Sequence, residues 1–176
     1  MYVGLLLGKS EANVANQDDL NLLRLLTPLL KLYTAKQAIN NSSEGLESFG
    51  GQGYIEDTGL PTIFRDSQVL SIWEGTTNVL SLDVLRCIEK SKGEVIKSFS
   101  LTITNTCEIG LNSNIEEIKA HSKLIMKSSN DLVKFMMKNQ NILMNCARDL
   151  SFSLSRVFIG KLQKNCLNLW NLWSNT

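Results

Sequence analysis

Residues 50–86 read GGQGYIEDTGLPTIFRDSQVLSIWEGTTNVLSLDVLR, and the rest of the chain is organised around this stretch. Three glycines at its start, Gly50, Gly51 and Gly53, let the backbone pass close to another backbone or to a phosphate, because no Cβ stands in the way. The carboxylate of Glu74 lies near its centre. Short polar residues suited to begin a helix follow Glu74, so we expect its side chain to face a cleft where a loop enters a helix.

Three blocks occur in order within this stretch: GGQGY (50–54), FRD (64–66) and IWEGT (72–76). In these blocks and in their spacing the chain resembles the acyl-CoA dehydrogenases, flavoenzymes that desaturate acyl thioesters between the α and β carbons. The run from residue 72 to residue 86 is most similar to the AidB-like branch, in which Trp precedes the glutamate and helices extend past the usual C-terminus. One position departs from the family pattern, which usually has Lys or Arg where this chain has Thr62.

The resemblance implies that Glu74 is the catalytic base of an FAD-dependent oxidation of acyl-CoA to 2,3-enoyl-CoA. A base is needed because the α-proton of an acyl-CoA is weakly acidic, and a carboxylate kept out of water against Trp73 would be a stronger base toward carbon. The backbone N–H at this glutamate is expected to hold the thioester oxygen, and Trp73 and Gly75 are expected to contact the substrate. Without the resemblance, Glu74 would be interpreted as a carboxylate that stabilises the start of a helix.

The resemblance also gives a set of expected FAD-binding residues, namely Glu47, Gly51, Thr76 and Asn78. Glu47 and Gly51 correspond to positions that line the adenosine pyrophosphate of an FAD bound mainly by another subunit. A homo-oligomer, dimer or tetramer, that shares FAD between subunits is therefore expected. Thr76 and Asn78 match positions that meet FAD after the glutamate. The electron acceptor and the acyl chain length are set by regions outside this stretch.

The composition fits a globular all-α protein. Of 176 residues, 43% are hydrophobic and 20% are charged, which excludes an intrinsically disordered chain. Only two prolines occur, so most of the chain outside the glycine-rich stretch can be helical. We expect a helical bundle of the acyl-CoA dehydrogenase C-terminal type with extra C-terminal helices. A polar break at Lys90–Gly93 is the expected boundary between residues 1–90, part of that domain, and residues 91–176, an additional helical region.

Capping residues and apolar periodicity predict the helix limits. Asp18 or Asp19 is expected to cap a leucine-rich helix. Thr27 and Pro28 are expected to start the next helix, because Thr is a good N-cap and Pro fits the first helical position. That helix is expected to end near Ser48. Later helices are expected over 76–89, 94–110, a segment that Asn112 or Ser113 caps, and 139–173, with Gly160 as a candidate bend or break.

Positive charge is concentrated at the C-terminal end, with a net charge of −4 over residues 1–112 and +5 over residues 113–176. Five lysines recur there at steps of four and seven, namely Lys119, Lys123, Lys127, Lys134 and Lys138. One helical face of lysines suits a phosphate backbone, so a flavoprotein-derived nucleic-acid-binding module is one alternative function. A solvated face is the favoured interpretation, and Trp170 and Trp173 are interpreted as packing residues. An inactive oligomerisation fragment is the other alternative.

Metal binding and membrane insertion are not expected. The four cysteines, Cys87, Cys107, Cys146 and Cys166, lie far apart, and His121 is the only histidine, so no zinc-site spacing exists. The apolar run near the N-terminus is too short to span a bilayer. We expect the chain to be a piece of a longer protein and to be inactive alone, because the helical and β-domains that precede this stretch in the family are missing. The resemblance implies a mitochondrial protein, with the cytoplasm as the alternative.

Overall fold

A computed structural model describes residues 1–174, with side chains through Leu162. Within this range the fold is all-α and contains no strand, as predicted. The helices are α1 (Tyr2–Glu11), α2 (Gln17–Ser48), α3 (Gly51–Tyr54), α4 (Leu60–Val69), α5 (Thr77–Lys90), α6 (Glu94–Leu111), α7 (Glu116–Lys138) and α8 (Ala147–Ser174), with short 3₁₀ turns η1 (Glu56–Thr58) and η2 (Gln140–Ile142). The side chains of Cys166, Trp170 and Trp173 lie outside the described residues.

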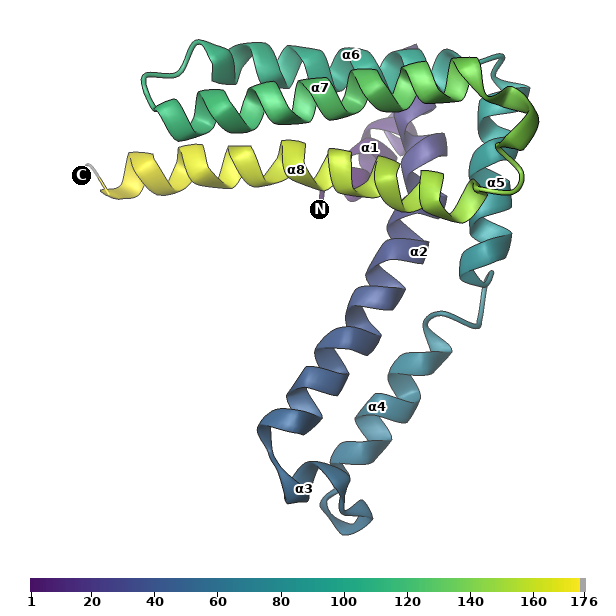
Figure 1. The fold of residues 1–176 in the computed structure, drawn as a ribbon, viewed down its shortest axis with the longest axis vertical. Coiled ribbons are helices and arrows are strands. Elements are labelled where there is room, and N and C mark those ends of the chain that lie inside the picture. The colour runs from purple at the N-terminus through teal and green to yellow at the C-terminus, as the bar shows by residue number, and fades with distance from the viewer. Residues whose placement is uncertain (175–176) are drawn as a thin grey trace.

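The long helix α2 connects two parts of the molecule (Figure 1). Its first half packs against α1, α5, α6 and α8, and α7 lies along α6 and α8. Its second half runs out of this body beside α4, with α3 at the far end. We call this projection, residues 36–69, the arm. Burial follows the same division, since the buried residues of α2 run from Leu22 to Ala35 and none lies beyond.

One hydrophobic core joins the helices of the body. Leu25 on α2, Val84 on α5 and Leu154 on α8 are completely buried, and Phe99 on α6 is almost completely buried. These side chains belong to a single cluster, so residues on both sides of the α5–α6 turn are buried together. The arm has no comparable core. Its surface and the turn that follows it expose large apolar side chains, including Phe49, Tyr54, Ile63, Ile72 and Trp73.

Pro28 does not start a new helix, and the prediction of a break at Thr27 is wrong. Helix α2 continues through Pro28, whose missing N–H leaves the carbonyl oxygen of Arg24 without its helical donor. The thiol of Cys87 on α5 lies 3.8 Å from that oxygen and donates to it. Packing against α5 therefore compensates the lost hydrogen bond. A local sequence pattern cannot predict this, because the donor comes from another helix.

The predicted N-terminal caps also differ from the structure. Asn16 is the N-cap of α2, where its side chain accepts from the N–H of Asp19 at 2.8 Å and the Asp19 carboxylate accepts from the N–H of Asn16. Asp19 thus completes a capping box from the third helical position. Helix α7 begins after Ile115 without a side-chain cap, although Ser113 Oγ accepts from the Ile115 N–H.

The final helix starts later than predicted and passes Gly160 without a break. Residues before Ala147 form η2 and a turn instead of helix. At Gly160 a Cβ would lie 2.4 Å from Ile125 Cδ1, so glycine permits a close approach of α7 and α8 there. His121 Nε2 lies 3.0 Å from the Gly160 carbonyl oxygen. His121 therefore contributes to the α7–α8 contact.

Lys161 on α8 is a buried cation, 4% exposed. Its Nζ lies 4.6 Å from the centroid of the Tyr2 ring and 4.8 Å from that of Phe158, both favourable cation–π distances. Burial nevertheless disfavours the charged form and lowers the pKa of Lys161 to about 8, while the nearby Cys107 acts in the opposite direction. At neutral pH the Lys161 amine is charged and buried, and this burial of a charge lowers the free energy of unfolding.

The contact between α2 and α3 predicts unequal effects of two neighbouring glycine substitutions. A Cβ at Gly53 would lie 2.0 Å from the Leu46 carbonyl oxygen, whereas a Cβ at Gly51 would meet nothing within 4 Å. Gly53→Ala should lower the free energy of unfolding by about 1–3 kcal/mol, and Gly51→Ala by less than about 0.5 kcal/mol. Urea denaturation followed by circular dichroism measures both. Equal destabilisation would contradict the close approach of α3 to α2.

Because Lys161 is buried, we expect the free energy of unfolding to depend on pH, and Lys161→Met should remove this dependence. In the unfolded chain the amine keeps its proton up to about pH 10.5, whereas in the folded chain the proton leaves near pH 8. The unfolded state binds more protons in this window, so wild type should gain stability relative to Lys161→Met as pH rises from 8 to 10.5. With partial solvent screening we expect a gain of about 2 kcal/mol. Denaturation curves at pH 7.5 and 10.5 test this, and a constant difference would contradict it.

Candidate functional site

Glu74 lies in the turn between α4 and α5, two residues before Thr76, which is the N-cap of α5. Its backbone has a φ of +57°, and Gly75 has a φ of +108°. A left-handed conformation is uncommon for a residue with a Cβ and costs about 1–2 kcal/mol. The surrounding structure must therefore hold the turn. Gly75 is favoured by its φ, and a Cβ there would lie 3.1 Å from Leu80 Cδ2, so the Leu80 side chain would have to shift slightly.

Lys31 holds this turn from α2. Its ammonium donates to the carbonyl oxygen of Trp73 at 2.9 Å and to the carbonyl oxygen of Leu70. These hydrogen bonds fix the end of α4 and the peptide that precedes Glu74. Sequence reasoning did not identify Lys31. The available signal was a cation within the apolar run from Leu29 to Leu32, but its partners lie 39 and 42 positions away.

Glu74 and Trp73 are both exposed in this chain, with Trp73 71% exposed. The sequence-based expectation that the Trp73 ring shelters the carboxylate from water is not met by the described residues. The exposed side chains Ile72 and Val79 lie beside them in sequence. An apolar surface of this kind on both sides of a carboxylate is suited to be covered by another part of a protein.

The predicted cofactor-binding residues fall into two groups. Thr76 and Asn78 lie at the start of α5 together with Trp73, Glu74 and Gly75, and both are exposed. The Asn78 side-chain oxygen accepts from Arg148 Nη1 on α8 at 2.9 Å.

Glu47 and Gly51 form the second group, at the far end of the arm, and both are exposed. Lys31 contacts the Glu74 turn, and Glu47 lies sixteen residues further along the same helix. At 1.5 Å per residue this separation is about 24 Å. The structure therefore does not bring Glu47 and Gly51 together with the Glu74 turn.

An ion pair fixes α5 against α2. Arg24 donates to both carboxylate oxygens of Asp83, at 3.1 and 3.2 Å, and Arg86 also contacts Asp83. The hydrogen-bonded Arg24 guanidinium holds the pKa of Asp83 below its usual value. Within the arm, Arg65 pairs with Glu56 at 3.0 Å and donates to the Thr62 hydroxyl, which connects α4 to η1.

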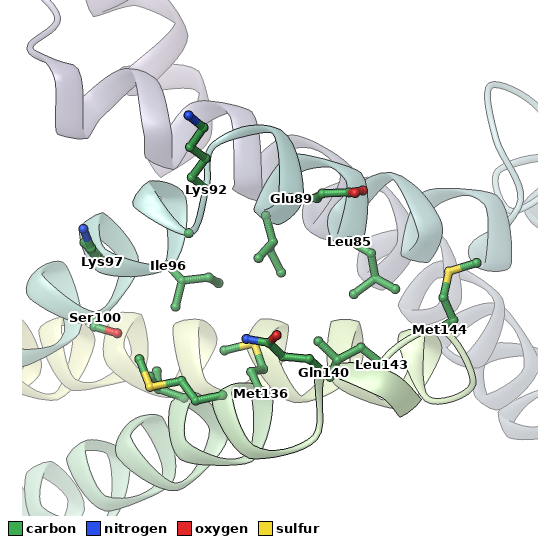
Figure 2. Close-up of a pocket in the computed structure, with 14 residues that line it drawn as sticks. Leu85, Glu89, Lys92, Ile96, Lys97, Ser100, Met136, Gln140, Leu143 and Met144 are labelled. Carbon is green, nitrogen blue, oxygen red and sulfur yellow. The ribbon is translucent and has the colours of Figure 1, made fainter.

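A cavity of about 820 Å³ lies elsewhere in the molecule (Figure 2). It is lined by the end of α5, the start of α6, the end of α7 and η2, with Leu85 and Ile96 facing Met136 and Leu143. The buried Ser100 hydroxyl beside it has no hydrogen-bond partner among the described residues. Because the cavity lies at the opposite end of α5 from Glu74, it is separate from the candidate active site.

The lysine row lies on α7 and is mostly exposed, with Lys119 paired to Glu116 at 2.6 Å. No side chain of residues 1–162 takes part in a His, Cys, Asp and Glu cluster that could hold a metal ion. None of the helices searched has an apolar stretch long enough to cross a bilayer.

Family models match most of the chain, and the first match includes the Glu74 turn. Residues 6–88 match the model of the acyl-CoA dehydrogenase C-terminal domain. The chain carries an acyl-CoA dehydrogenase C-terminal domain. Residues 94–165 match a second model, the acyl-CoA dehydrogenase 11 C-terminal domain-like family. The recognition made from the three sequence blocks is therefore confirmed.

Known relatives of this acyl-CoA dehydrogenase domain extend over most of the chain. Acyl-CoA dehydrogenase family member 11 of Caenorhabditis elegans is 42% identical over 167 residues, which are 89% of this chain and 26% of the relative. The AidB protein of Escherichia coli, named a putative acyl-CoA dehydrogenase, is 43% identical over 70 residues, 40% of this chain and 13% of the relative. This chain thus spans about a quarter of the length of the first of these relatives.

Two solved structures share the fold of the domain. The crystal structure of Caenorhabditis elegans ACDH-11 in complex with C11-CoA superposes with a TM-score of 0.85 at 39% identity, over 92% of this chain and 28% of that one. The apo form of Bd2924 superposes with a TM-score of 0.73 at 38% identity, over 93% of this chain and 29% of that one. Each superposition covers more than nine tenths of this chain, so most of its fold is shared, including helices that follow α5.

Proposed function

We propose that the protein containing this chain is an FAD-dependent acyl-CoA dehydrogenase that oxidises an acyl-CoA thioester to the 2,3-enoyl-CoA. The observation that carries the proposal is the IWEGT turn, where Glu74 is held in a left-handed conformation at the start of α5 and faces out of the core. The relatives named acyl-CoA dehydrogenases support the reaction class.

In this proposal Glu74 removes the α-proton, and its own backbone N–H donates to the thioester oxygen, where negative charge develops. Bound FAD supplies the acceptor for the hydride that leaves the β-carbon. Trp73 and Gly75 flank the carboxylate and would contact the acyl thioester. Shelter from water would come from the parts of the protein that cover Ile72, Trp73 and Val79.

The residues present fit an FAD site in part. Gly51 is exposed and has nothing within 4 Å of where a Cβ would stand, so a pyrophosphate can approach its backbone. Thr76 and Asn78 offer exposed polar side chains beside Glu74. Glu47 fits less well, because a carboxylate repels a pyrophosphate.

The separation of the two groups supports a shared cofactor site. One group, Glu47 and Gly51, lies at the far end of the arm, and the other, Thr76 and Asn78, lies at the start of α5. One copy of the chain would then contribute to two FAD molecules, which requires a homo-oligomer. The exposed apolar side chains of the arm, including Phe49 and Ile63, are suited to such an interface.

The role of Glu74 is tested by Glu74→Gln in the full-length protein. Anaerobic mixing with a saturated acyl-CoA, followed by the bleaching of flavin absorbance, isolates the chemical step. Removing a general base typically costs about 10²–10⁴ in rate, and we expect a loss in this range with FAD and acyl-CoA binding retained.

Glu89→Gln is the matched control, since Glu89 is an exposed carboxylate at the opposite end of α5. It should bleach at the wild-type rate. A carboxylate that only stabilises the helix start would contribute less than about 1 kcal/mol and leave turnover near normal. Undiminished bleaching in Glu74→Gln would therefore remove Glu74 from the mechanism.

A further inference from the structure

The peptide between Trp73 and Glu74 connects Lys31 to the proposed chemistry. Lys31 donates to the carbonyl oxygen of this peptide, and the N–H of the same peptide belongs to Glu74. The bond is trans, so the C=O and the N–H point in opposite directions. With the oxygen held toward α2, the Glu74 N–H is directed away from α2.

The Glu74 N–H is available as a donor. It makes no hydrogen bond within the part of the chain that the structure describes. An ammonium on the carbonyl oxygen also polarises the amide, which strengthens the N–H as a donor. The orientation of this group is therefore set by a side chain more than forty positions away in the sequence.

We propose that Lys31 is a positioning residue, which aims the Glu74 N–H at the thioester oxygen and keeps Glu74 in its left-handed conformation. The inference rests on the proposed function, because it gives a role to the donor that the proposed reaction uses. Lys31 touches neither the substrate nor the cofactor in this assignment. It acts through the peptide that it holds.

A simpler role for Lys31 is the capping of α4. The last carbonyls of a helix lack intrahelical donors, and a cation near them is stabilising. The Leu70 carbonyl belongs to this set, since Leu70 is the C-cap of α4. The Trp73 carbonyl lies three residues beyond the cap, in the turn itself, so the second hydrogen bond acts on the Glu74 peptide and not only on the helix end.

The test uses the full-length protein with its FAD and compares Lys31→Met with Lys36→Met. Lys36 is a half-buried lysine further along α2 that makes no hydrogen bond or ion pair among the residues that the structure describes. The first readout is amide hydrogen exchange over residues 70–76. Exchange should accelerate at least tenfold in Lys31→Met and stay at the wild-type rate in Lys36→Met.

The second readout is the carbonyl stretching band of a bound acyl-CoA analogue with sulfur in place of the β-carbon, which cannot release a hydride. In wild type the thioester band should lie below its frequency in water, because the Glu74 N–H polarises the carbonyl. Lys31→Met should move the band back toward the frequency in water. It should also lower the flavin bleaching rate by about tenfold, less than loss of an oxyanion donor. Lys36→Met should change neither value.

The outcomes separate this inference from the proposed function. Faster exchange in Lys31→Met with an unchanged band and bleaching rate overturns the positioning role, while a defect in Glu74→Gln leaves the proposed function standing. Unchanged exchange overturns the role of Lys31 in holding the turn. Active Glu74→Gln overturns the proposed function, and the exchange data then still report on the turn. If Lys31→Met fails to fold, Lys31→Arg keeps a cationic donor at this position. A wild-type band and bleaching rate in that variant, with wild-type exchange over residues 70–76, support positioning. A band moved toward the frequency in water while exchange over residues 70–76 stays at the wild-type rate contradicts it.

Discussion

The structure depends on the continuity of α2 through Pro28. The hydrogen bond from the Cys87 thiol to the Arg24 carbonyl oxygen lies at this point of the helix. A proline inside a helix typically costs about 3 kcal/mol or more. The cost is tolerated here because α5 packs against the helix at this point, with the Arg24–Asp83 ion pair beside it. A single helix of 32 residues can then belong to the core at one end and to the arm at the other.

The continuity of α2 places Lys31 within reach of the turn between α4 and α5. Lys31 follows Pro28 by one helical turn, between Leu29 and Leu32, which are both buried in the core. Its backbone is therefore fixed by the body of the molecule, while its side chain reaches the turn after α4. A helix that restarted at Pro28 with a new direction would carry the lysine elsewhere. The contact of Lys31 with the turn that holds Glu74 depends in this way on packing about one helical turn earlier on α2.

Much of the fold could be predicted from the sequence, and the failures have a common cause. The helical class, the end of α2 near Ser48 and the helix after Glu74 follow from local chemistry: apolar periodicity, glycine at the stop and polar residues at the start. Thr27-Pro28 carries an equally good local signal for a helix start, yet the contact with Cys87 overrides it. Local rules cannot include a donor that comes from another helix.

In the candidate site, too, some residues could be predicted from the sequence and others required the structure. The three sequence blocks were sufficient to identify Glu74, Trp73 and Gly75 as one group, and the structure keeps these consecutive residues in one turn. The position of Glu47 and Gly51 at the far end of the arm, and the contact of Lys31, required the spatial arrangement of α2 and α4. The shelter of Glu74 could not be found in this chain because the described residues do not provide it.

The hydrogen bond from Arg148 to Asn78 gives the C-terminal helices a direct connection to the start of α5. The Arg148 guanidinium also lies 5.6 Å from the centroid of the Phe152 ring, so its position is constrained by α8 itself. The Asn78 oxygen has two lone pairs and can accept a second hydrogen bond while Arg148 fixes its orientation. Loss of Arg148 would remove the hydrogen bond that fixes the Asn78 rotamer, so a residue of α8 bears on the first turn of α5 without any change near Glu74.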